Sequence, residues 1–207
     1  MFGRWRKIRA DRKLWAEART LTDLCGLMAR WVEGELSMWP GYSDGAAEET
    51  LALVPVLARA NRGGFLTDAS QPGFDGTGFD GLHWQQRAAV SGFVADEQVL
   101  SRIRVAATAA GLVVFISHPR LLPQGRGGTC TLRGGQPYTV FGEYMPPRLL
   151  RHLWAGVHRQ AMAEIVDAWQ VTVADPDYGP NDRVWVALDA AVDVFPAVPV
   201  IGAERGV

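Results

Sequence analysis

Apolar residues return at the spacing of a helix in four stretches of the chain. Between Leu24 and Leu36 they recur every three or four positions, and charged residues lie between them. This period places the apolar side chains on one face of an α-helix, which completes a turn in about 3.6 residues. Along the whole chain it predicts helices near residues 22–36, 46–61, 97–110 and 147–169.

Shorter apolar runs rich in branched residues lie between these helices and predict strands. The runs at 87–95 and 112–117 flank the helix expected at 97–110, and a strand, a helix and a strand in this order form a βαβ unit. Residues 112–116 are almost wholly apolar, which predicts a strand buried on both faces. The other expected strands span 65–70, 129–133, 138–141, 170–174 and 183–188.

Together these elements predict an α+β fold with a mixed β-sheet of about five to seven strands. The chain has 207 residues, of which 48% are hydrophobic and 21% are charged, and these shares are ordinary for a globular protein. No polar stretch is long enough to join two independent domains, so residues 1–207 are expected to form a single domain. Several Pro residues near the end predict an irregular C-terminal tail over 190–207.

The first 13 residues form a basic N-terminal arm. They carry six basic side chains and one acidic side chain, although the net charge of the whole chain is -1. Such an arm can bind the phosphates of a nucleic acid, but the body offers no second basic patch, so nucleic acid is the less favoured partner. The residues that would make this contact are Arg4, Arg6, Lys7, Arg9, Arg12 and Lys13.

A Gly-rich loop after the strand at 65–70 carries the candidate ligand site. Ligands of open α/β sheets usually bind at strand ends and the loops beyond them. The segment Ser70-Gln71-Pro72-Gly73 combines a hydroxyl and an amide with residues that fix the backbone and allow close approach. Trp84 can stack on a planar polar ligand such as a nucleobase. The predicted ligand-binding residues are Thr67, Ser70, Gln71, Trp84, Gln86 and Arg87.

Each of these features also has a purely structural interpretation. The loop can be a stiff connection without a ligand, and Trp84 can cover a sheet edge while Arg87 pairs with Asp68 or Asp80. If the protein is an enzyme, Asp68 and His118 are the candidates for an acid or a base. Ser117 and His118 point to opposite faces of a strand, and the chain lacks a Gly-x-Ser-x-Gly motif, so no catalytic triad is predicted.

The sequence predicts neither a metal site nor a cofactor. Asp75, Asp80, His83 and Glu48 offer ligand atoms, but their spacing matches no metal motif. The segment Gly125-Arg126-Gly127-Gly128 lacks the Lys of a P-loop. The pair Gly76 and Gly78 likewise has no strand before it at the spacing of a dinucleotide site.

Cysteine usage and hydropathy predict a cytoplasmic protein. Cys25 and Cys130 lie 105 residues apart, and neither has a partner at the spacing of a zinc site or a redox pair. No run approaches the roughly 18 apolar residues of a membrane span, and the N-terminus lacks the apolar region of a signal peptide. We therefore expect a reducing compartment and no membrane partner.

A series of short motifs resembles those of an uncharacterised protein family found mainly in Streptomyces and related actinobacteria. Only two of the 21 basic residues are Lys, a bias typical of a GC-rich genome. The resemblance implies a domain of unknown function and brings no activity, ligand or catalytic residue with it. The motifs that carry it are Arg19-Thr20-Leu21, Asp23-Leu24, Ala29-Arg30-Trp31, Glu33-Gly34, Glu49-Thr50, Leu53-Val54-Pro55, Asn61-Arg62, Gly64-Phe65, Thr67, Ser70-Gln71-Pro72-Gly73 and Gln86-Arg87-Ala88.

Two classes of function remain open. The first is binding or modification of a small, nucleotide-like molecule at the strand ends around 67–87. The second is a non-enzymatic protein-interaction or assembly module, in which some of the eight Trp residues contact a protein partner or a second copy of the chain. The sequence does not decide whether the protein is an enzyme.

Overall fold

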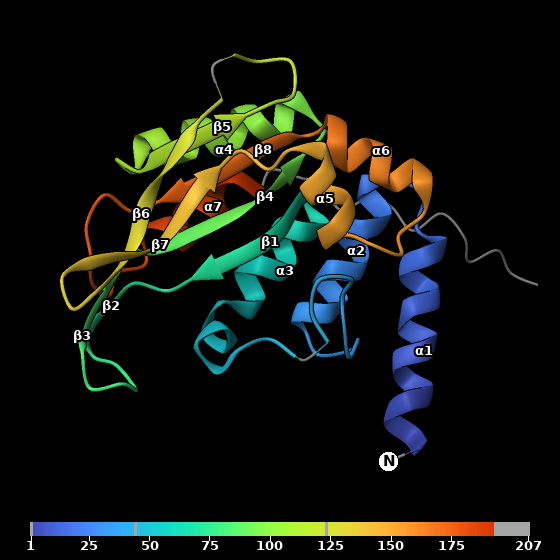
Figure 1. Ribbon diagram of the computed structural model, residues 1–207. Coiled ribbons are helices and arrows are strands. Elements are labelled where there is room, and N and C mark those ends of the chain that lie inside the picture. Colours follow the sequence, from blue (N-terminus) through green and yellow to red (C-terminus); the bar gives the residue numbers. More distant parts are fainter. Residues whose placement is uncertain (1, 44, 123, 193–207) are drawn as a thin grey trace, which may run out of the picture.

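The computed structural model describes residues 2–43, 45–122 and 124–192. In this part of the chain, two antiparallel sheets of four strands pack with seven α-helices into one α+β domain (Figure 1). The first sheet has the order β1 (Phe65–Gln71), β4 (Ala89–Val94), β8 (Trp169–Ala174) and β5 (Val113–Ser117). The second has the order β2 (Phe74–Thr77), β3 (His83–Gln86), β6 (Arg126–Arg133) and β7 (Gln136–Glu143).

Two of the longer helices begin at a side-chain cap. Thr20 and Asp23 form a capping box at the start of α2, and Asp96 accepts a hydrogen bond from Gln98 N at the start of α4. The α-helices are α1 (Phe2–Glu17), α2 (Leu21–Val32), α3 (Val54–Arg62), α4 (Glu97–Ala109), α5 (Pro147–Leu153), α6 (Arg159–Asp167) and α7 (Arg183–Val192). A 3₁₀-helix, η1 (Glu48–Leu53), precedes α3. No helix in the described part of the chain is long and apolar enough to cross a membrane.

The α+β class and the unit β4-α4-β5 are confirmed, but the expected single mixed sheet is wrong. β4 and β5 run in the same direction, and β8 lies between them antiparallel to both. A strand from a distant part of the chain thus enters the βαβ unit and makes all neighbouring pairs antiparallel. β5 becomes an edge strand whose residues 113–116 are only half-buried, so the expectation of burial on both faces is also wrong.

Two of the expected long helices are divided. The segment 46–61 forms η1 and then α3, because Pro55 fits the first turn of a helix but cannot donate to the preceding turn. The segment 147–169 forms α5 and α6, and the chain reverses its course between them with Gly156 at a φ of 97°. Apolar residues keep the helical spacing across this break, so the pattern alone does not reveal it.

The end of the described chain also differs from expectation. Residues 183–188 form the start of α7 rather than a strand, because Val184, Leu188 and Val192 share one buried helical face that packs on α3 and α4. Residues 190–192 belong to this helix, and residues 193–207 of the predicted tail lie outside the described part of the chain.

Helices cover one face of the first sheet, and helices and the second sheet share the other. Phe65 and Val90 point into a core formed with α3, α4 and α7. Leu66 and Phe93, on the opposite face, pack with α2 and α6 and with the buried Trp154. Ala89 and its neighbours contact the second sheet. The edge strand β1 contacts both α2 and α3 (Figure 1).

Candidate functional site

The predicted Gly-rich loop is a β-hairpin, and the candidate site begins before it, at a bulge in β1. Thr67 pairs with Gly92 and Ala69 pairs with Ser91, which leaves Asp68 as the extra residue. A β-bulge turns the local side chain out of the regular alternation of a strand. Since β1 is an edge strand, this bulge directs Asp68 away from the sheet and toward the segment that follows α2.

A cleft of about 280 Å³ lies beside Asp68, and we call it the Asp68 cleft. β1 supplies one wall, α2 and Leu57 of α3 supply the second, and residues from the segments 39–42 and 46–50 supply the third. The side chains are aromatic, small apolar or hydroxyl-bearing, and Asp68 is the single charged one among the described residues. The lining residues are Met28, Trp31, Val32, Trp39, Gly41, Tyr42, Ala46, Ala47, Thr50, Leu57, Thr67, Asp68, Ala69 and Ser70.

Three aromatic rings stand together in this cleft. Trp31 contacts Trp39 at a ring-centre distance of 6.2 Å and Tyr42 at 6.3 Å, both with edge-to-face geometry. Trp39 and Tyr42 are joined by two backbone hydrogen bonds of 2.9 and 3.0 Å that close a tight turn. Gly41 is required in this turn, because a Cβ atom there would lie 2.5 Å from the Trp39 ring.

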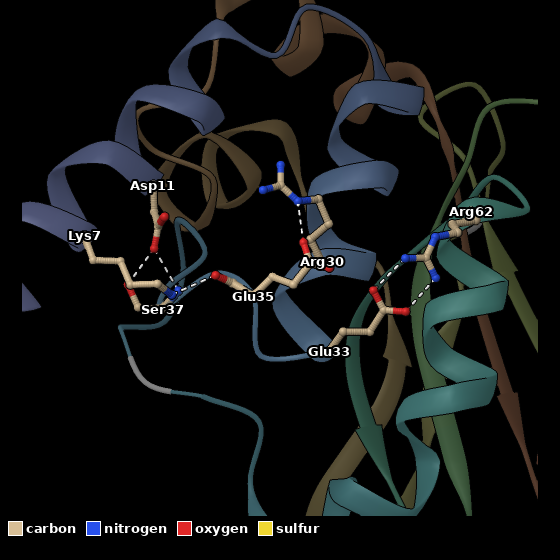
Figure 2. A network of polar contacts seen from close by, with 7 residues as sticks. All are labelled: Lys7, Asp11, Arg30, Glu33, Glu35, Ser37 and Arg62. Atoms are coloured by element: carbon tan, nitrogen blue, oxygen red, sulfur yellow. Dashed lines mark hydrogen bonds and ion pairs between the residues drawn. The ribbon is translucent and has the colours of Figure 1, made fainter. Parts of the chain in front are cut away.

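Polar contacts from α1 hold residues 35–38, which lead into the turn from Trp39 to Tyr42 (Figure 2). The buried Asp11 accepts hydrogen bonds from Ser37 N at 2.8 Å and Ser37 Oγ at 2.5 Å. Lys7 Nζ donates to the carbonyl of Glu35 at 2.7 Å, and Trp15 Nε1 donates to the carbonyl of Met38 at 3.0 Å. The segment that leads into the turn is therefore held in place before it reaches Trp39.

Two ion pairs attach the same segment to α2 and α3 (Figure 2). Arg30 Nε lies 2.9 Å from Glu35 Oε2, and the guanidinium of Arg62 forms a two-pronged pair with Glu33 at 2.7 and 2.5 Å. The hydrogen bonds from Arg62 lower the pKa of Glu33. Pairs of this kind add geometric definition more than stability at an exposed position.

The carboxyl group of Asp68 has no ion-pair partner among the described residues. The residue as a whole is half-buried, and its Oδ1 atom is buried without a hydrogen-bond partner. Burial raises the pKa of Asp68 from its ordinary 3.8 to about 6, although the backbone N–H groups of Asp68 and Ala69 act in the opposite direction. A group of this pKa exchanges its proton near neutral pH.

Thr67 and Ser70 also line the Asp68 cleft, as the sequence predicted for a ligand site. The buried Thr67 hydroxyl accepts a hydrogen bond from Asn61 Nδ2 at 2.7 Å, and Thr67 N donates to Asn61 Oδ1 at 3.0 Å. Asn61 thereby fixes the end of α3 to β1. Thr67 keeps one hydroxyl proton that it can donate.

Gln71 and Arg87 lie elsewhere, in a group that we call the strand-end cluster: Gln71, Arg87, Asp175, Tyr178 and Arg183. Gln71 Nε2 donates to the carbonyl oxygens of Arg87 and Cys130 at 2.9 and 3.1 Å, and its Oε1 accepts from Thr131 Oγ1 at 3.2 Å. These bonds use the whole amide to join the two sheets.

The strand-end cluster holds a buried carboxylate of its own. Asp175 Oδ1 accepts hydrogen bonds from Asp177 N and from the guanidinium of Arg183, while Asp175 Oδ2 is buried without a partner. The Arg87 guanidinium lies over the Tyr178 ring, 4.5 Å from its centre, so Arg87 pairs with neither Asp68 nor Asp80.

Gly73, the last residue of the Ser70-Gln71-Pro72-Gly73 segment, lies close to another part of the protein's own backbone. A Cβ atom at this position would lie 2.0 Å from the carbonyl oxygen of Gly179, in the loop after β8. The close approach expected of this glycine therefore occurs, but its partner is the protein's own backbone. Only Ser70 of this segment remains beside the Asp68 cleft.

Trp84 and Gln86 lie on β3 in the hairpin of the second sheet. The Trp84 ring contacts Phe79 and Tyr138 at ring-centre distances of 5.4 and 5.1 Å, and its Nε1 donates to Asp80 at 2.9 Å. Gln86 pairs with Phe74 and Thr131 in the sheet. The structure thus separates these two residues from the Asp68 cleft.

His118 is also separated from Asp68, because β1 and β5 run in opposite directions. Ser117 pairs with Gln170 near the end of the sheet where β1 begins. The His118 ring stacks on Trp169 at 4.3 Å, its Nε2 lies 3.0 Å from the carbonyl of Asp167, and Arg120 N donates to its Nδ1. Both ring nitrogens are occupied by structural contacts.

The basic arm forms most of α1, with its side chains turned outward. Arg6, Arg9, Arg12 and Lys13 are exposed, and the side chain of Arg4 lies outside the described residues. Cys25 and Cys130 are free and buried, and burial raises the pKa of both thiols. No group of His, Cys, Asp or Glu residues suited to a metal ion occurs in the described part of the chain.

Sequence reasoning missed the aromatic wall of the cleft. The helical spacing places Trp31 on the apolar stripe of α2, which predicts a core position, and the segment Trp39-Pro40-Gly41-Tyr42 carries the Pro and Gly typical of a turn after a helix. The available signal was the density of aromatic residues around a Pro-Gly turn. The sequence does not show that these aromatic residues line a cleft, because they meet Asp68 of β1 only in the folded protein.

Comparison with known proteins identifies the family. No curated protein matches the chain. The family described as "Domain of unknown function (DUF6919)" matches residues 10–194, which include all strands of both sheets and every described residue of the Asp68 cleft. The chain therefore belongs to this family of uncharacterised domains.

Proposed function

We propose that this domain binds a small molecule in the Asp68 cleft. The observation that carries the proposal is the buried, unpartnered Asp68 Oδ1 beside three clustered aromatic rings. A polar atom buried without a partner costs folding free energy, and one that lies beside a cleft can gain a partner from a ligand. A cleft of about 280 Å³ fits the lower end of ligand-site sizes and favours a small ligand.

The Asp68 cleft contains only some of the residues predicted for the site. Thr67, Asp68 and Ser70 line the cleft and remain its polar groups. Gln71 and Arg87 belong to the strand-end cluster, and His118 is held by structural contacts. Asp68 can take up or release a proton near neutral pH, but among the described lining residues only Tyr42 is also titratable, so binding is better supported than catalysis.

A fragment screen monitored by the indole N–H signals of the eight Trp residues tests the proposal. The expected result is that ligands shift the signals of Trp31 and Trp39 and leave those of Trp84 and Trp185 unchanged. Trp31→Phe and Trp84→Phe provide the assignments and a matched control outside the cleft. If no fragment perturbs Trp31 or Trp39, the proposal is overturned.

A protein-interaction module is the second candidate, and it is favoured by exposed apolar residues on the hairpin of the second sheet. Phe79 is 92% exposed and Tyr138 is 54% exposed, and both contact Trp84. Exposed aromatic residues of this kind are typical of protein interfaces. Sedimentation analysis of the wild type and of Phe79→Ser over a range of concentrations tests self-association through this hairpin; a monomer throughout speaks against a homo-oligomer.

Composition supports two further proposals about the setting of the protein. The scarcity of Lys among the basic residues supports a GC-rich source such as Streptomyces or a related actinobacterium. Two free cysteines support a reducing cytoplasm.

A further inference from the structure

We infer that the ligand of the Asp68 cleft is a small organic cation with a substituted ammonium group. This inference rests on the proposed function, because it names the chemical class that the same cleft selects. It follows from the charge, the aromatic faces and the scarcity of polar partners in the cleft, which are considered in turn.

The charge of the cleft favours a cation. Asp68 is the single charged side chain among the described lining residues, and no Lys, Arg or His is among them. An anion would meet a carboxylate with no basic group to balance it. A nucleotide, which the sequence suggested, carries phosphates that need basic side chains or a helix N-terminus, so this ligand class is replaced.

The aromatic rings favour a cation of low hydration. Trp39 and Tyr42 both meet the Trp31 ring near edge-on, at interplanar angles of 64° and 88°. The three rings therefore lie in different planes, and all three line the cleft. A cation is attracted to the negative face of Trp or Tyr, and recognition of quaternary ammonium groups by aromatic side chains uses this attraction.

The remaining lining favours a substituted over a primary ammonium. A primary ammonium donates three hydrogen bonds and loses stability when they are not satisfied. Beyond Asp68, the hydroxyl groups are those of Tyr42, Thr50, Thr67 and Ser70, and Thr67 already contacts Asn61. Much of the remaining side-chain surface is apolar and suits methyl groups: Met28, Val32, Ala46, Ala47, Leu57 and Ala69.

Three probes of matched shape test the inference. Choline is the cation, 3,3-dimethyl-1-butanol is its neutral counterpart, and 3,3-dimethylbutanoate is an anion of similar size. Each is titrated into the full-length protein while the indole signals of Trp31, Trp39 and Trp84 are followed. We expect choline to shift Trp31 and Trp39 and to bind at least tenfold more tightly than the neutral probe.

Substitutions separate the charge from the rings. Asp68→Asn should weaken choline binding at least tenfold and leave the neutral probe unaffected, whereas Trp39→Ala should weaken both. Unchanged thermal unfolding of these variants, apart from the stabilisation expected of Asp68→Asn, shows that the fold is intact. Loss of choline binding in Trp84→Phe would place the site elsewhere and overturn the inference.

The possible failures are distinguishable. If the neutral or anionic probe shifts Trp31 and Trp39 as strongly as choline does, the cleft binds ligands but the cation assignment is wrong. If none of the three probes shifts these signals while other fragments do, the cation assignment again fails and the proposed function stands. If no compound of any charge shifts them, both fail.

Discussion

Asp68 and Asp175 both place a carboxyl group against the first sheet, but the surrounding residues treat them differently. Asp175 is fully buried, and the Arg183 guanidinium and the Asp177 backbone N–H hold its Oδ1 atom. Asp68 projects from a bulge into an aromatic cleft, and its Oδ1 atom has no partner. Asp175 Oδ2 also lacks a partner, but two donors hold the other oxygen of that carboxylate, so the proposed function assigns Asp175 to the fold and Asp68 to a ligand.

Two neighbouring parts of the segment 67–73 have different contacts. Gln71 and Gly73 join β1 to the second sheet and to the loop after β8. Thr67, Asp68 and Ser70, only a few residues earlier, face the cleft. Substitution of the structural carboxylate and of the cleft carboxylate should therefore change the free energy of unfolding in opposite directions.

The largest effect is expected from Asp175→Ala. Asp175 is the fully buried member of a partly buried ion pair, and its removal takes an acceptor from both Arg183 and the Asp177 N–H, so the free energy of unfolding should fall by about 3 kcal/mol. Urea unfolding at pH 7.5 measures this change. Asp177→Ala is the matched control, because Asp177 contacts the same Arg183 from an exposed position; equal losses in both variants would contradict the role given to Asp175.

Gln71→Ala should lower the free energy of unfolding by about 2 kcal/mol, since it removes three hydrogen bonds, two of them buried, that join the two sheets. Gln85→Ala serves as the control, because the Gln85 amide donates only to Asp75 on the hairpin. If Gln71→Ala costs no more than Gln85→Ala, then Gln71 does not join the sheets and is again a candidate for ligand binding.

Asp68→Asn should stabilise the protein at pH 8 by about 1 to 2 kcal/mol, after allowance for solvent screening of a half-buried group. The folded-state pKa of Asp68 lies above the ordinary value of 3.8, so the folded protein holds this proton more tightly than the unfolded chain does. The wild type therefore loses this contribution as the pH rises from about 4 to about 6, and the Asp68→Asn variant does not.

Unfolding curves of both proteins at pH 4.5 and pH 8 measure this difference. The stabilisation should be complete at the higher pH and reduced to about a third at the lower one, which still lies above the pKa of the unfolded chain. A variant that is less stable than the wild type at pH 8 would show that Asp68, like Asp175, serves the fold.

The smallest effect is expected from Ser70→Ala. Ser70 is half-buried at the margin of the cleft, and substitutions at such positions usually change the free energy of unfolding by less than about 0.5 kcal/mol. The same urea measurements check this value. A loss as large as that of Gln71→Ala would extend the structural region into the cleft.

The sequence predicted local elements better than their partners. The stripe of α2, the helix α4 and the strands at 129–133 and 138–141 depend on neighbouring residues, and all are found in the structure. The insertion of β8 between β4 and β5 depends on contacts between distant segments, and no local pattern contains it. The helix α7 was missed because its apolar spacing becomes clear only when residues 191 and 192 are included.

The candidate site was predicted in part for a similar reason. Thr67, Asp68 and Ser70 follow one another in a single strand, so the sequence placed them together correctly. The sequence did not reveal the directions of the side chains. The bulge turns the Asp68 side chain toward α2, whereas the Gln71 side chain points between the sheets. Trp31 and Trp39 reach the cleft through the turn after α2, and their meeting with β1 is a tertiary contact.

The titration of the Asp68 carboxyl carbon by NMR tests the difference between the two carboxylates most directly. We predict a midpoint near pH 6, as expected of a carboxyl group that is buried without a cationic partner. The absence of this signal in Asp68→Asn provides the assignment. A midpoint at or below the ordinary 3.8 would show that Asp68 is already paired in the folded protein, and would contradict its availability to a ligand.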